Sequence, residues 1–369
     1  MKIGIDARTL KIKGGSEVYA RNLINKLDNK KFILFGIDKY KNFKCLDTKI
    51  KSDSIFRLIY ENFGLIKLIK KEEIGLFHGL KGSIPLRGKF KKIITILDVS
   101  PKIYPNYFNF KDMIYWKFIL PLSLRRCDMI ISISENTGED ITKYFNISRN
   151  KIRSIPLGFD QDLFYVKNKK DSIKKIKTFM IKNKLDIRNN KIVLNINTIQ
   201  PRKNISNLIR AFNVLAKKHH EYVLIIIGKK GWKYQEIVKT FQESNFKDRI
   251  YLLDFVPDKL LPEFYNSAEL FVYPSLYEGF GLPPLEAMAC GCPVITSNTS
   301  SLPEVVGDAG IMIDPNNVEE LEKQIKRVLT NEKLRKEMIK KGLEQSKKFS
   351  WEKCAKETLK VYNEVLNEK

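Results

Sequence analysis

Two glutamates bracket a stretch of the chain whose composition is unusual. Glu278 and Glu286 are separated by seven residues, and between them a glycine-rich loop leads into a predicted helix that begins near Pro283 and stops at Gly291. Proline is well suited to the first turn of a helix, and glycine to its end. A glycine loop that precedes a helix offers backbone N–H groups and the positive end of a dipole, and both bind phosphate or sugar oxygens.

The spacing gives the two glutamates different predicted tasks. Glu278 lies in the loop beside the bound group, while Glu286 lies about one turn inside the helix, where it accepts hydrogen bonds from vicinal hydroxyls such as those of a ribose. A buried turn and helix with two incidental glutamates would give the same spacing. The composition between the glutamates, together with a second feature upstream, favours the binding site.

The second feature is a pair of adjacent cations. Arg202 and Lys203 follow the apolar run 192–196, which predicts a buried strand. Arginine forms a bidentate fork and lysine acts as a point charge, so the pair suits a diphosphate at the end of a parallel strand. A solvated loop pair is the simpler alternative in a chain this rich in Lys and Arg, but the position directly after a buried strand favours the functional interpretation.

These motifs, with others along nearly the whole chain, resemble the retaining nucleotide-sugar glycosyltransferases of family 4 (glycosyl transferases group 1), which have the GT-B fold. The further blocks that carry the resemblance are 3–8, 14–23, 95–98, 132–135, 155–160 and 349–353. The resemblance implies transfer of a hexose, mannose-like or glucose-like, from a nucleotide diphosphate sugar. It implies a surface-polysaccharide, lipopolysaccharide or lipid-linked acceptor.

The resemblance also implies roles for the residues of the glycine loop. Glu278 would hold the hydroxyls of the donor sugar and face the positive charge that develops on it, and Glu286 would bind the ribose hydroxyls. Backbone amides of Phe280, Gly281 and Leu282 would bind sugar and phosphate oxygens. All five residues would then act on the donor.

The chemistry explains why two cations are needed. Breaking the anomeric C–O bond places negative charge on the β-phosphate, and Arg202 and Lys203 would stabilise that charge electrostatically. With both cations present we expect neither a metal nor another cofactor. The sequence also has no clear Asp-x-Asp metal motif at a strand end.

Further candidates lie in the first half of the chain. Gly14 and Gly15 precede a helix that opens near Ser16, and by resemblance their loop closes over the donor phosphate; alone, the pair is merely a turn. His78 ends the predicted strand 74–78 and is a candidate catalytic contact, although a lone histidine is usually structural. Asp98 is a candidate contact to acceptor or donor.

The chain departs from the family pattern at two positions. Family members often carry a histidine that contacts the donor sugar before the equivalent of Asp98, where this chain has Leu97. Either the sugar is contacted differently, His78 substitutes, or the activity is altered. Asn197 stands where a small glycine is usual, and asparagine tolerates left-handed backbone geometry, so we expect the turn to persist.

Composition limits the classes of partner. The chain has 369 residues, five cysteines and a formal net charge of +25. Its length suggests two domains. The positive charge suits an anionic membrane surface and the anionic donor; without a nucleic-acid motif we expect no nucleic-acid partner. The scattered cysteines and the absence of a signal peptide or membrane-spanning run predict a reduced cytoplasmic protein, peripheral at most on the inner face of the membrane.

Short apolar runs alternate with helical stretches, which indicates an α/β protein with parallel sheets. The strands expected are 2–5, 32–36, 74–78, 92–96, 129–132 and 152–155, then 191–196, 222–227, 250–253, 270–273, 293–296 and 310–313. Helices are expected at 16–27, 172–184, 205–217 and 351–366, the second as a solvated basic helix. The fold class predicted is GT-B, with two Rossmann-like doubly wound domains that face a cleft.

The domains follow from this pattern and from the resemblance. We expect an N-terminal acceptor domain at 1–165 and a nucleotide-sugar donor domain at 166–350. By resemblance, a last helix at 351–369 crosses back to the N-terminal domain. Two alternatives remain open: a GT-B-type nucleotide-sugar epimerase or sugar phosphorylase, and a basic binding module without catalysis.

Overall fold

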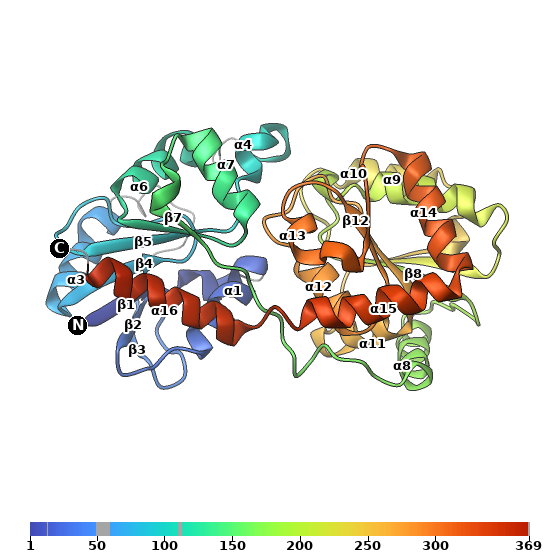
Figure 1. The fold of residues 1–369 in the computed structure, drawn as a ribbon, viewed down its shortest axis with the longest axis horizontal. Helices are drawn as coiled ribbons and strands as arrows, with labels where there is room; N and C mark the ends of the chain where they lie inside the picture. The colour runs from blue at the N-terminus through green and yellow to red at the C-terminus, as the bar shows by residue number, and fades with distance from the viewer. Residues whose placement is uncertain (13, 49–59, 110–112, 368–369) are drawn as a thin grey trace. The chain divides into compact units, whose positions relative to one another are not determined.

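The computed structural model describes residues 1–12, 14–48, 60–109 and 113–367. The chain divides into two units, one formed by Met1–Gly158 together with Trp351–Lys369 and the other by Phe159–Ser350. The boundary predicted at 165/166 therefore lies inside the second unit. Each unit has its own parallel sheet with helices on both faces (Figure 1), so the predicted doubly wound α/β class is confirmed.

The first unit contains a seven-stranded sheet in the order β3-β2-β1-β4-β5-β6-β7. Its strands are β1 Lys2–Asp6, β2 Phe32–Phe35, β3 Lys44–Leu46, β4 Ile74–Gly79, β5 Lys91–Ile96, β6 Met129–Ser132 and β7 Ile152–Ser154. All the strand pairs are parallel. The sequence did not predict β3, whose three residues are too few to show a pattern. The direction of winding reverses between β1 and β4.

Helices cover both faces of this sheet. Those within the described residues of the unit include α1 Gly15–Asn25, α3 Gly64–Lys71, α4 Ser100–Ile103, α6 Leu120–Arg126, α7 Glu135–Phe145 and α16 Trp351–Asn367. Helix α16 packs beside α1 and against β4 and β6, on the opposite face from α6 and α7 (Figure 1). Its residues Ala355, Tyr362 and Val365 are buried as the amphipathic pattern predicts, whereas Leu359 and Leu366 are only half-buried.

The second unit contains a six-stranded sheet in the order β10-β9-β8-β11-β12-β13, again entirely parallel. Its strands are β8 Lys191–Ile196, β9 Tyr222–Ile227, β10 Ile250–Leu253, β11 Ala268–Tyr273, β12 Val294–Ser297 and β13 Ile311–Ile313. Every residue of β9 is buried, as expected for a strand covered on both faces. Here the winding reverses between β8 and β11.

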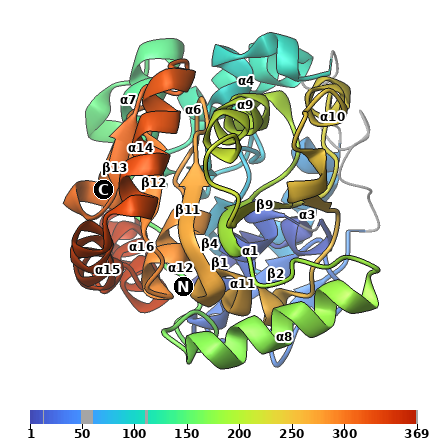
Figure 2. The same ribbon diagram turned by 90° about the vertical axis from the view of Figure 1, so that its right-hand side faces the viewer.

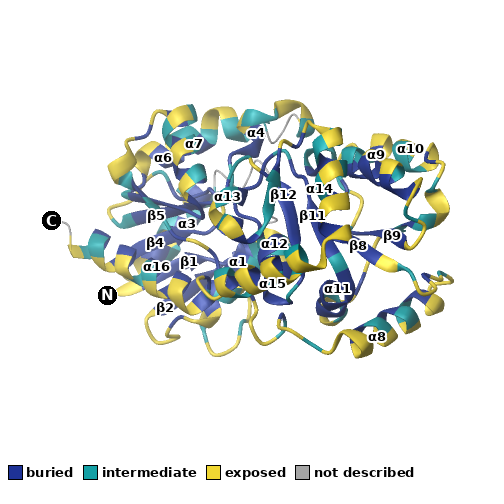
Figure 3. Ribbon diagram, turned by 45° about the vertical axis from the view of Figure 1, so that its right-hand side comes forward, coloured by how far each residue is buried: buried dark blue, intermediate teal, exposed yellow. Residues whose placement is uncertain are grey.

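The helices of the second unit lie in two layers. They are α8 Lys169–Lys182, α9 Ile205–Ala216, α10 Gln235–Gln242, α11 Leu261–Ser267, α12 Leu282–Ala289, α13 Leu302–Val306, α14 Val318–Thr330 and α15 Glu332–Ser346. Figure 2 shows α9 and α10 on one side of the sheet and α8 and α11 on the other. In Figure 3 the strands are buried and the exposed residues follow the outer faces of the helices. The core side chains of α9, Leu208, Phe212 and Leu215, recur every three to four residues.

Helix α8 differs from the solvated basic helix that the sequence predicts. It begins one turn earlier, where the Asn168 side chain accepts from the amides of the first turn, and it packs against α11. Its Ile176 and Met180 are fully buried. The buried carboxylate of Glu263 on α11 accepts a hydrogen bond from Ser172 Oγ at 2.6 Å and pairs with Lys175 Nζ at 2.9 Å. Part of the basic helix is therefore structural.

All five cysteines lie in the described residues and carry free thiols, four of them buried and Cys45 half-buried. Within the described ranges, no helix combines the length and the apolar character needed to cross a membrane.

Candidate functional site

The sheet order of the second unit brings the predicted cations and the predicted carboxylate together. Arg202 and Lys203 lie in the short 3-10 turn Pro201–Lys203 that follows β8, and Glu278 lies in the loop after β11. Because β8 and β11 are neighbours at the reversal of winding, their carboxyl ends open onto one crevice, the usual ligand site of such sheets.

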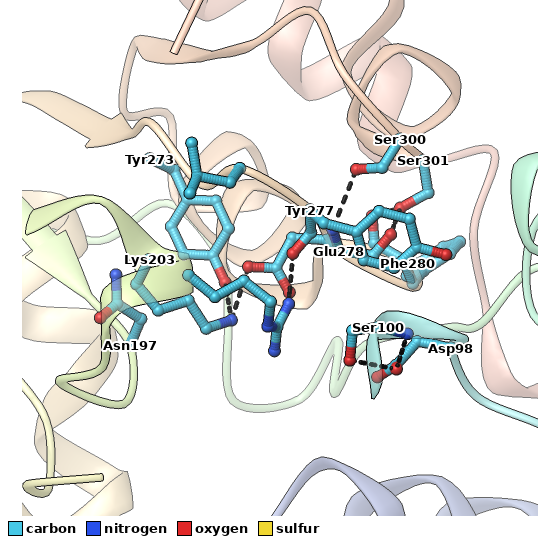
Figure 4. Close-up of polar contacts among 12 residues, drawn as sticks. Asp98, Ser100, Asn197, Lys203, Tyr273, Tyr277, Glu278, Phe280, Ser300 and Ser301 are labelled. Atoms are coloured by element: carbon cyan, nitrogen blue, oxygen red, sulfur yellow. Dashed lines mark hydrogen bonds and ion pairs between the residues drawn. The ribbon is translucent and has the colours of Figure 1, made fainter. Parts of the chain in front are cut away.

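The three side chains form a compact ionic cluster. Lys203 Nζ lies 2.5 Å from Glu278 Oε1, and Arg202 Nη1 lies 3.2 Å from Glu278 Oε2. Arg202 also donates to the backbone carbonyl of Tyr277. Each of the three charged side chains is only about one tenth exposed. Figure 4 shows Lys203 and Glu278 directed toward each other, with Tyr273 beside them.

The two neighbouring cations keep the carboxyl group of Glu278 ionised. Burial alone raises the pKa of Glu278, but the charges of Lys203 and Arg202 outweigh burial and hold this pKa at about 2. Two cations and one anion leave one positive charge in excess. A site of this kind attracts a ligand that carries more than one negative charge.

Tyr273, at the end of β11, is a member of the cluster that sequence reasoning missed. Its hydroxyl accepts a hydrogen bond from Lys203 Nζ at 3.1 Å, and the lysine nitrogen lies 5.4 Å from the ring centroid. Burial raises the pKa of Tyr273 well above its ordinary value, so the phenol stays neutral. The signal available was a tyrosine as the last residue of a strand at the ligand-binding edge.

The loop after β12 holds the glycine loop in place, which sequence reasoning also missed. The backbone N–H of Glu278 donates to Ser300 Oγ at 2.9 Å. The fully buried Ser301 Oγ donates to the carbonyls of Glu278 and Phe280, at 2.9 Å and 2.6 Å. A run of hydroxyl residues, 299–301, directly after a parallel strand was the signal that could have revealed this support.

Gly281 makes the turn from the loop into α12. Its φ of +126° lies where side-chain-bearing residues are strained, and an added Cβ would lie 2.9 Å from Leu302 Cδ2. Leu282 is the first residue of α12, and Pro283 and Pro284 after it have no N–H. The amides of Phe280, Gly281 and Leu282 therefore remain as the backbone N–H groups at this helix start, and their contact with a ligand stays a prediction.

Glu286 lies in the second turn of α12, half-buried. Its Oε2 accepts a hydrogen bond from Tyr265 Oη of α11 at 3.1 Å. Burial raises the pKa of Glu286 to about 8, although the bond from Tyr265 opposes this shift. At neutral pH the carboxyl is therefore largely protonated, unlike Glu278 on the same motif.

The structure corrects the expected start of the first helix. Helix α1 begins at Gly15, with Gly14 as the residue that precedes it, and Ser16 lies inside the helix without a capping role. Gly14 has a φ of +148°, which explains a glycine there. Glu17 pairs with Arg21 one turn later, at 2.7 Å.

His78 is the penultimate residue of β4, at the carboxyl end of the strand where the sequence places it, but its side chain is enclosed in the interior of the first unit. It is fully buried; its Nδ1 is 2.7 Å from Tyr362 Oη on α16 and its Nε2 is 2.8 Å from Thr95 Oγ1 on β5. The physical reason is that β4 continues to Gly79 and α16 covers it. Burial lowers the pKa of His78 to about 3, so the ring is neutral.

Asp98 and Asn197 both stabilise their own loops. Asp98 Oδ1 accepts from the N–H and the hydroxyl of Ser100, at 2.8 Å and 2.5 Å, and so supports the start of α4. Asn197 donates to Asn195 Oδ1 at 2.9 Å. The left-handed residue in this loop is Asn204, with φ of +56°, rather than Asn197.

No group of three or more His, Cys, Asp or Glu side chains within the described ranges is arranged to hold a metal ion. The charged cluster around Glu278 instead contains two fixed cations.

Comparison with known sequences identifies relatives for both units. The model of the family described as Glycosyl transferases group 1 matches residues 177–345, and that described as Glycosyltransferase Family 4 matches residues 13–163. The O-antigen chain mannosyltransferase B of Escherichia coli is 34% identical over 288 residues, which is 78% of this chain and 74% of that protein. The serotype-specific mannosyltransferase WbdA of the same species is 32% identical over 65% of this chain, but the match spans only 29% of that protein.

Solved structures share the fold of this chain. A sucrose-phosphate synthase from Thermosynechococcus elongatus superimposes with a TM-score of 0.81 over 98% of each chain, at 22% identity. HepE of Anabaena, solved in complex with UDP and glucose, has a TM-score of 0.76 over 98% of this chain and 99% of that one, at 19% identity. At these identities the likeness shows the fold alone.

Proposed function

Because the chain belongs to glycosyltransferase family 4 and has the GT-B fold, we propose that it transfers a hexose, mannose-like or glucose-like, from a nucleotide diphosphate sugar to a glycan or lipid-linked acceptor. The acceptor class proposed is a surface polysaccharide, a lipopolysaccharide or their lipid-linked precursors. The configuration at the anomeric carbon is retained.

One observation carries this proposal. At the carboxyl edge of β8 and β11, two cations converge on one buried carboxylate, and the three side chains are each about one tenth exposed. A diphosphate would draw Arg202 and Lys203 toward its oxygens, and Glu278 would then lie next to the sugar attached to that diphosphate. The start of α12 supplies further N–H donors to the same ligand.

The proposed transfer needs no metal ion, because the bonds, electrons and proton are all accounted for by the donor, the acceptor and the side chains of the cluster. The bond between the anomeric carbon and the β-phosphate oxygen breaks, and the acceptor oxygen bonds to that carbon from the same face. The departing phosphate keeps the bonding electrons and takes the acceptor's proton. Arg202 and Lys203 stabilise the negative charge on the phosphate, and Glu278 stabilises the positive charge on the sugar.

The nature of the hexose rests on the relatives. The proteins named mannosyltransferases above favour mannose, while the family resemblance of the sequence also allows glucose. The two sugars differ in one hydroxyl configuration. The proposal therefore covers both sugars, and the donor nucleotide is left to measurement.

A thermal-shift panel of nucleotide diphosphates and their sugars tests the donor site. A ligand that binds only the folded protein raises its melting temperature, so one nucleotide family should produce a clear shift. Release of nucleotide diphosphate that depends on an added acceptor would then test transfer. A folded sample that responds to none of these ligands would reject the proposal.

Substitution at Arg202 provides the first matched test. Arg202→Ala should weaken nucleotide diphosphate binding roughly 10- to 100-fold, the effect of losing charge-assisted hydrogen bonds. Arg210→Ala, at an exposed position of α9, is the control and should leave binding unchanged. Equal dissociation constants for both variants would remove Arg202 from the donor site.

A further inference from the structure

An exposed stripe of large apolar side chains runs along the helical segment 113–126 of the first unit. Ile114, Phe118 and Leu122 are 44%, 55% and 42% exposed. They recur every four residues, through the π-helical turn Tyr115–Ile119 and into α6, so they lie on one side of the segment. Aliphatic and aromatic side chains of this size are rarely left in a row on a soluble surface without a partner.

Cations flank this stripe. An open hollow of about 480 Å³ is lined by Phe118, Leu122 and three cationic side chains, Lys102, Lys117 and Arg125. Lys117 Nζ lies 5.4 Å from the Phe118 ring centroid, so a cation and an exposed aromatic ring lie side by side on this surface. The segment 113–126 has no acidic residue. The stripe and these cations form the basic apolar face.

Helix α7 adds further aromatic and cationic side chains to the basic apolar face. Helix α7 ends at the hollow, where Tyr144 forms part of the wall and Lys143 Nζ lies 5.2 Å from the Tyr144 ring centroid. The exposed segments of α6 and α7 can be followed in Figure 3. The helical segment 113–126 and α7 therefore both contribute aromatic rings and cations to one surface.

We infer that the basic apolar face docks the protein onto an anionic lipid bilayer. Apolar side chains on one side of a helix, with cations along its borders, are suited to the boundary between acyl chains and headgroups. Anionic headgroups attract each nearby Lys or Arg, and the hollow presents three such side chains around one space. An acidic protein partner would match the charges, but the adjoining row of exposed Ile, Phe and Leu favours the acyl boundary of a bilayer.

The biological purpose of this docking rests on the proposed function, because a lipid-linked acceptor lies at the bilayer surface. The physical claim of docking is nevertheless independent of catalysis. Binding to vesicles can therefore be measured whether or not the donor and acceptor are known.

The test is co-sedimentation of the full chain with vesicles of phosphatidylcholine alone and of phosphatidylcholine mixed with phosphatidylglycerol. The wild type should bind the mixed vesicles, bind the neutral ones weakly, and lose binding as salt is raised. Phe118→Ser/Leu122→Ser and Lys117→Glu/Arg125→Glu should each reduce binding to the mixed vesicles at least about tenfold.

Matched controls lie on the second unit. Ile181→Ser/Val214→Ser changes two apolar residues that are 65% and 49% exposed, and Lys326→Glu/Lys340→Glu reverses the charge of two exposed lysines. Both controls should bind the mixed vesicles as the wild type does. Circular dichroism with cooperative unfolding like that of the wild type would show that both units of each variant are folded. A retained thermal shift with the nucleotide diphosphate would show that the donor site in the second unit is intact.

Three outcomes would overturn the inference. The first is that the wild type does not bind the mixed vesicles. The second is that the variants of the basic apolar face bind these vesicles as well as their controls do. The third is that the protein binds duplex DNA but no vesicles and that Lys117→Glu/Arg125→Glu abolishes the DNA binding, which would assign the face to nucleic acid. Absence of any nucleotide shift in the wild type would count against the proposed function and would leave the vesicle result valid.

Discussion

At the scale of single residues, Glu278 offsets part of the positive charge of the site when no ligand is bound. Its carboxylate forms ion pairs with Lys203 at 2.5 Å and with Arg202 at 3.2 Å. A diphosphate must therefore compete with this carboxylate for the same two cations. The proposed catalytic group is at the same time a competitor of the donor, and this has a measurable consequence.

Glu278→Gln should separate turnover from binding. We expect turnover to fall by about 100-fold or more, because a neutral amide cannot stabilise positive charge on the sugar. Affinity for the nucleotide diphosphate should be equal or higher, since the cations have lost their competing anion. Steady-state kinetics and calorimetric titration measure the two quantities.

Glu263→Gln is the control for Glu278→Gln, because Glu263 is also buried and also paired with two lysines, Lys167 and Lys175, but in α11. It should lose stability without losing turnover per folded molecule. Unchanged turnover in the Glu278 variant would remove this residue from the mechanism.

Glu286 predicts a dependence of stability on pH. Its pKa is about 8 in the folded chain against an ordinary 4.5, so between these values the folded state holds a proton that the unfolded state has released. The contribution of Glu286 to stability is therefore complete below pH 4.5 and is lost as the pH rises through 8.

Glu286→Gln keeps an acceptor for Tyr265 and removes the ionisable group. The variant should thus gain stability relative to the wild type as the pH rises from about 5 to about 8, the range between the pKa of Glu286 in the unfolded chain and its pKa in the folded chain. Urea unfolding at both ends of that window measures the gain. A stability difference that does not vary with pH would show that Glu286 titrates normally.

At the scale of elements, a buried hydrogen-bonded chain fixes α16 to the first sheet. It runs from Tyr19 on α1 to Thr95 on β5, then through His78 on β4 to Tyr362 on α16, with contacts of 3.0, 2.8 and 2.7 Å. All four side chains are buried. Each of these four elements, α1, β5, β4 and α16, therefore provides a hydrogen-bond partner for a buried side chain of another.

Tyr362→Phe should lower the free energy of unfolding by about 1–3 kcal/mol, because it leaves a buried ring nitrogen without its partner. Turnover per folded molecule should stay unchanged, and so should nucleotide binding. Chemical denaturation and kinetics on the same sample measure this. If His78→Ala reduces turnover of folded protein far more than Tyr362→Phe does, the catalytic expectation for His78 gains support instead.

The same elements show what the sequence can and cannot reveal. Strands β8, β9 and β10 were predicted at their observed bounds, because continuous apolar runs between turn residues are a local signal. The three hydroxyl residues after β12 and Tyr273 on β11 were missed, since their roles depend on which strands become neighbours. Burial of His78 depends on a helix nearly three hundred positions later in the chain, and no local pattern shows that packing.

At the scale of the whole molecule, the chain forms one unit that is continuous in sequence and one that is not. The second unit is continuous from Phe159 to Ser350, while the first needs Trp351–Lys369 in addition to Met1–Gly158. The cations and Glu278 lie entirely within the continuous unit. Donor binding and the integrity of the first unit should therefore respond separately to changes at α16.

A chain that ends at Ser350 tests this separation. Without α16, the apolar residues of α1 and β4 that it covers become exposed, and the first unit should lose its cooperative unfolding. The second unit should still show a thermal shift with the nucleotide diphosphate. Limited proteolysis followed by mass spectrometry would locate the cleaved segments; resistance of 60–109 and 113–158 to cleavage would contradict the prediction.

The position of α16 has a consequence for biosynthesis. A ribosome releases β1 to β7 first, then the entire second unit, and only at the end the helix that covers the first sheet. Throughout that interval, the face around His78 is an unfinished apolar surface on a nascent chain, at risk of wrong association. The half of the protein that is made first is therefore the half that finishes folding last, and a cell that makes it quickly would need chaperones for the beginning of the chain more than for its middle.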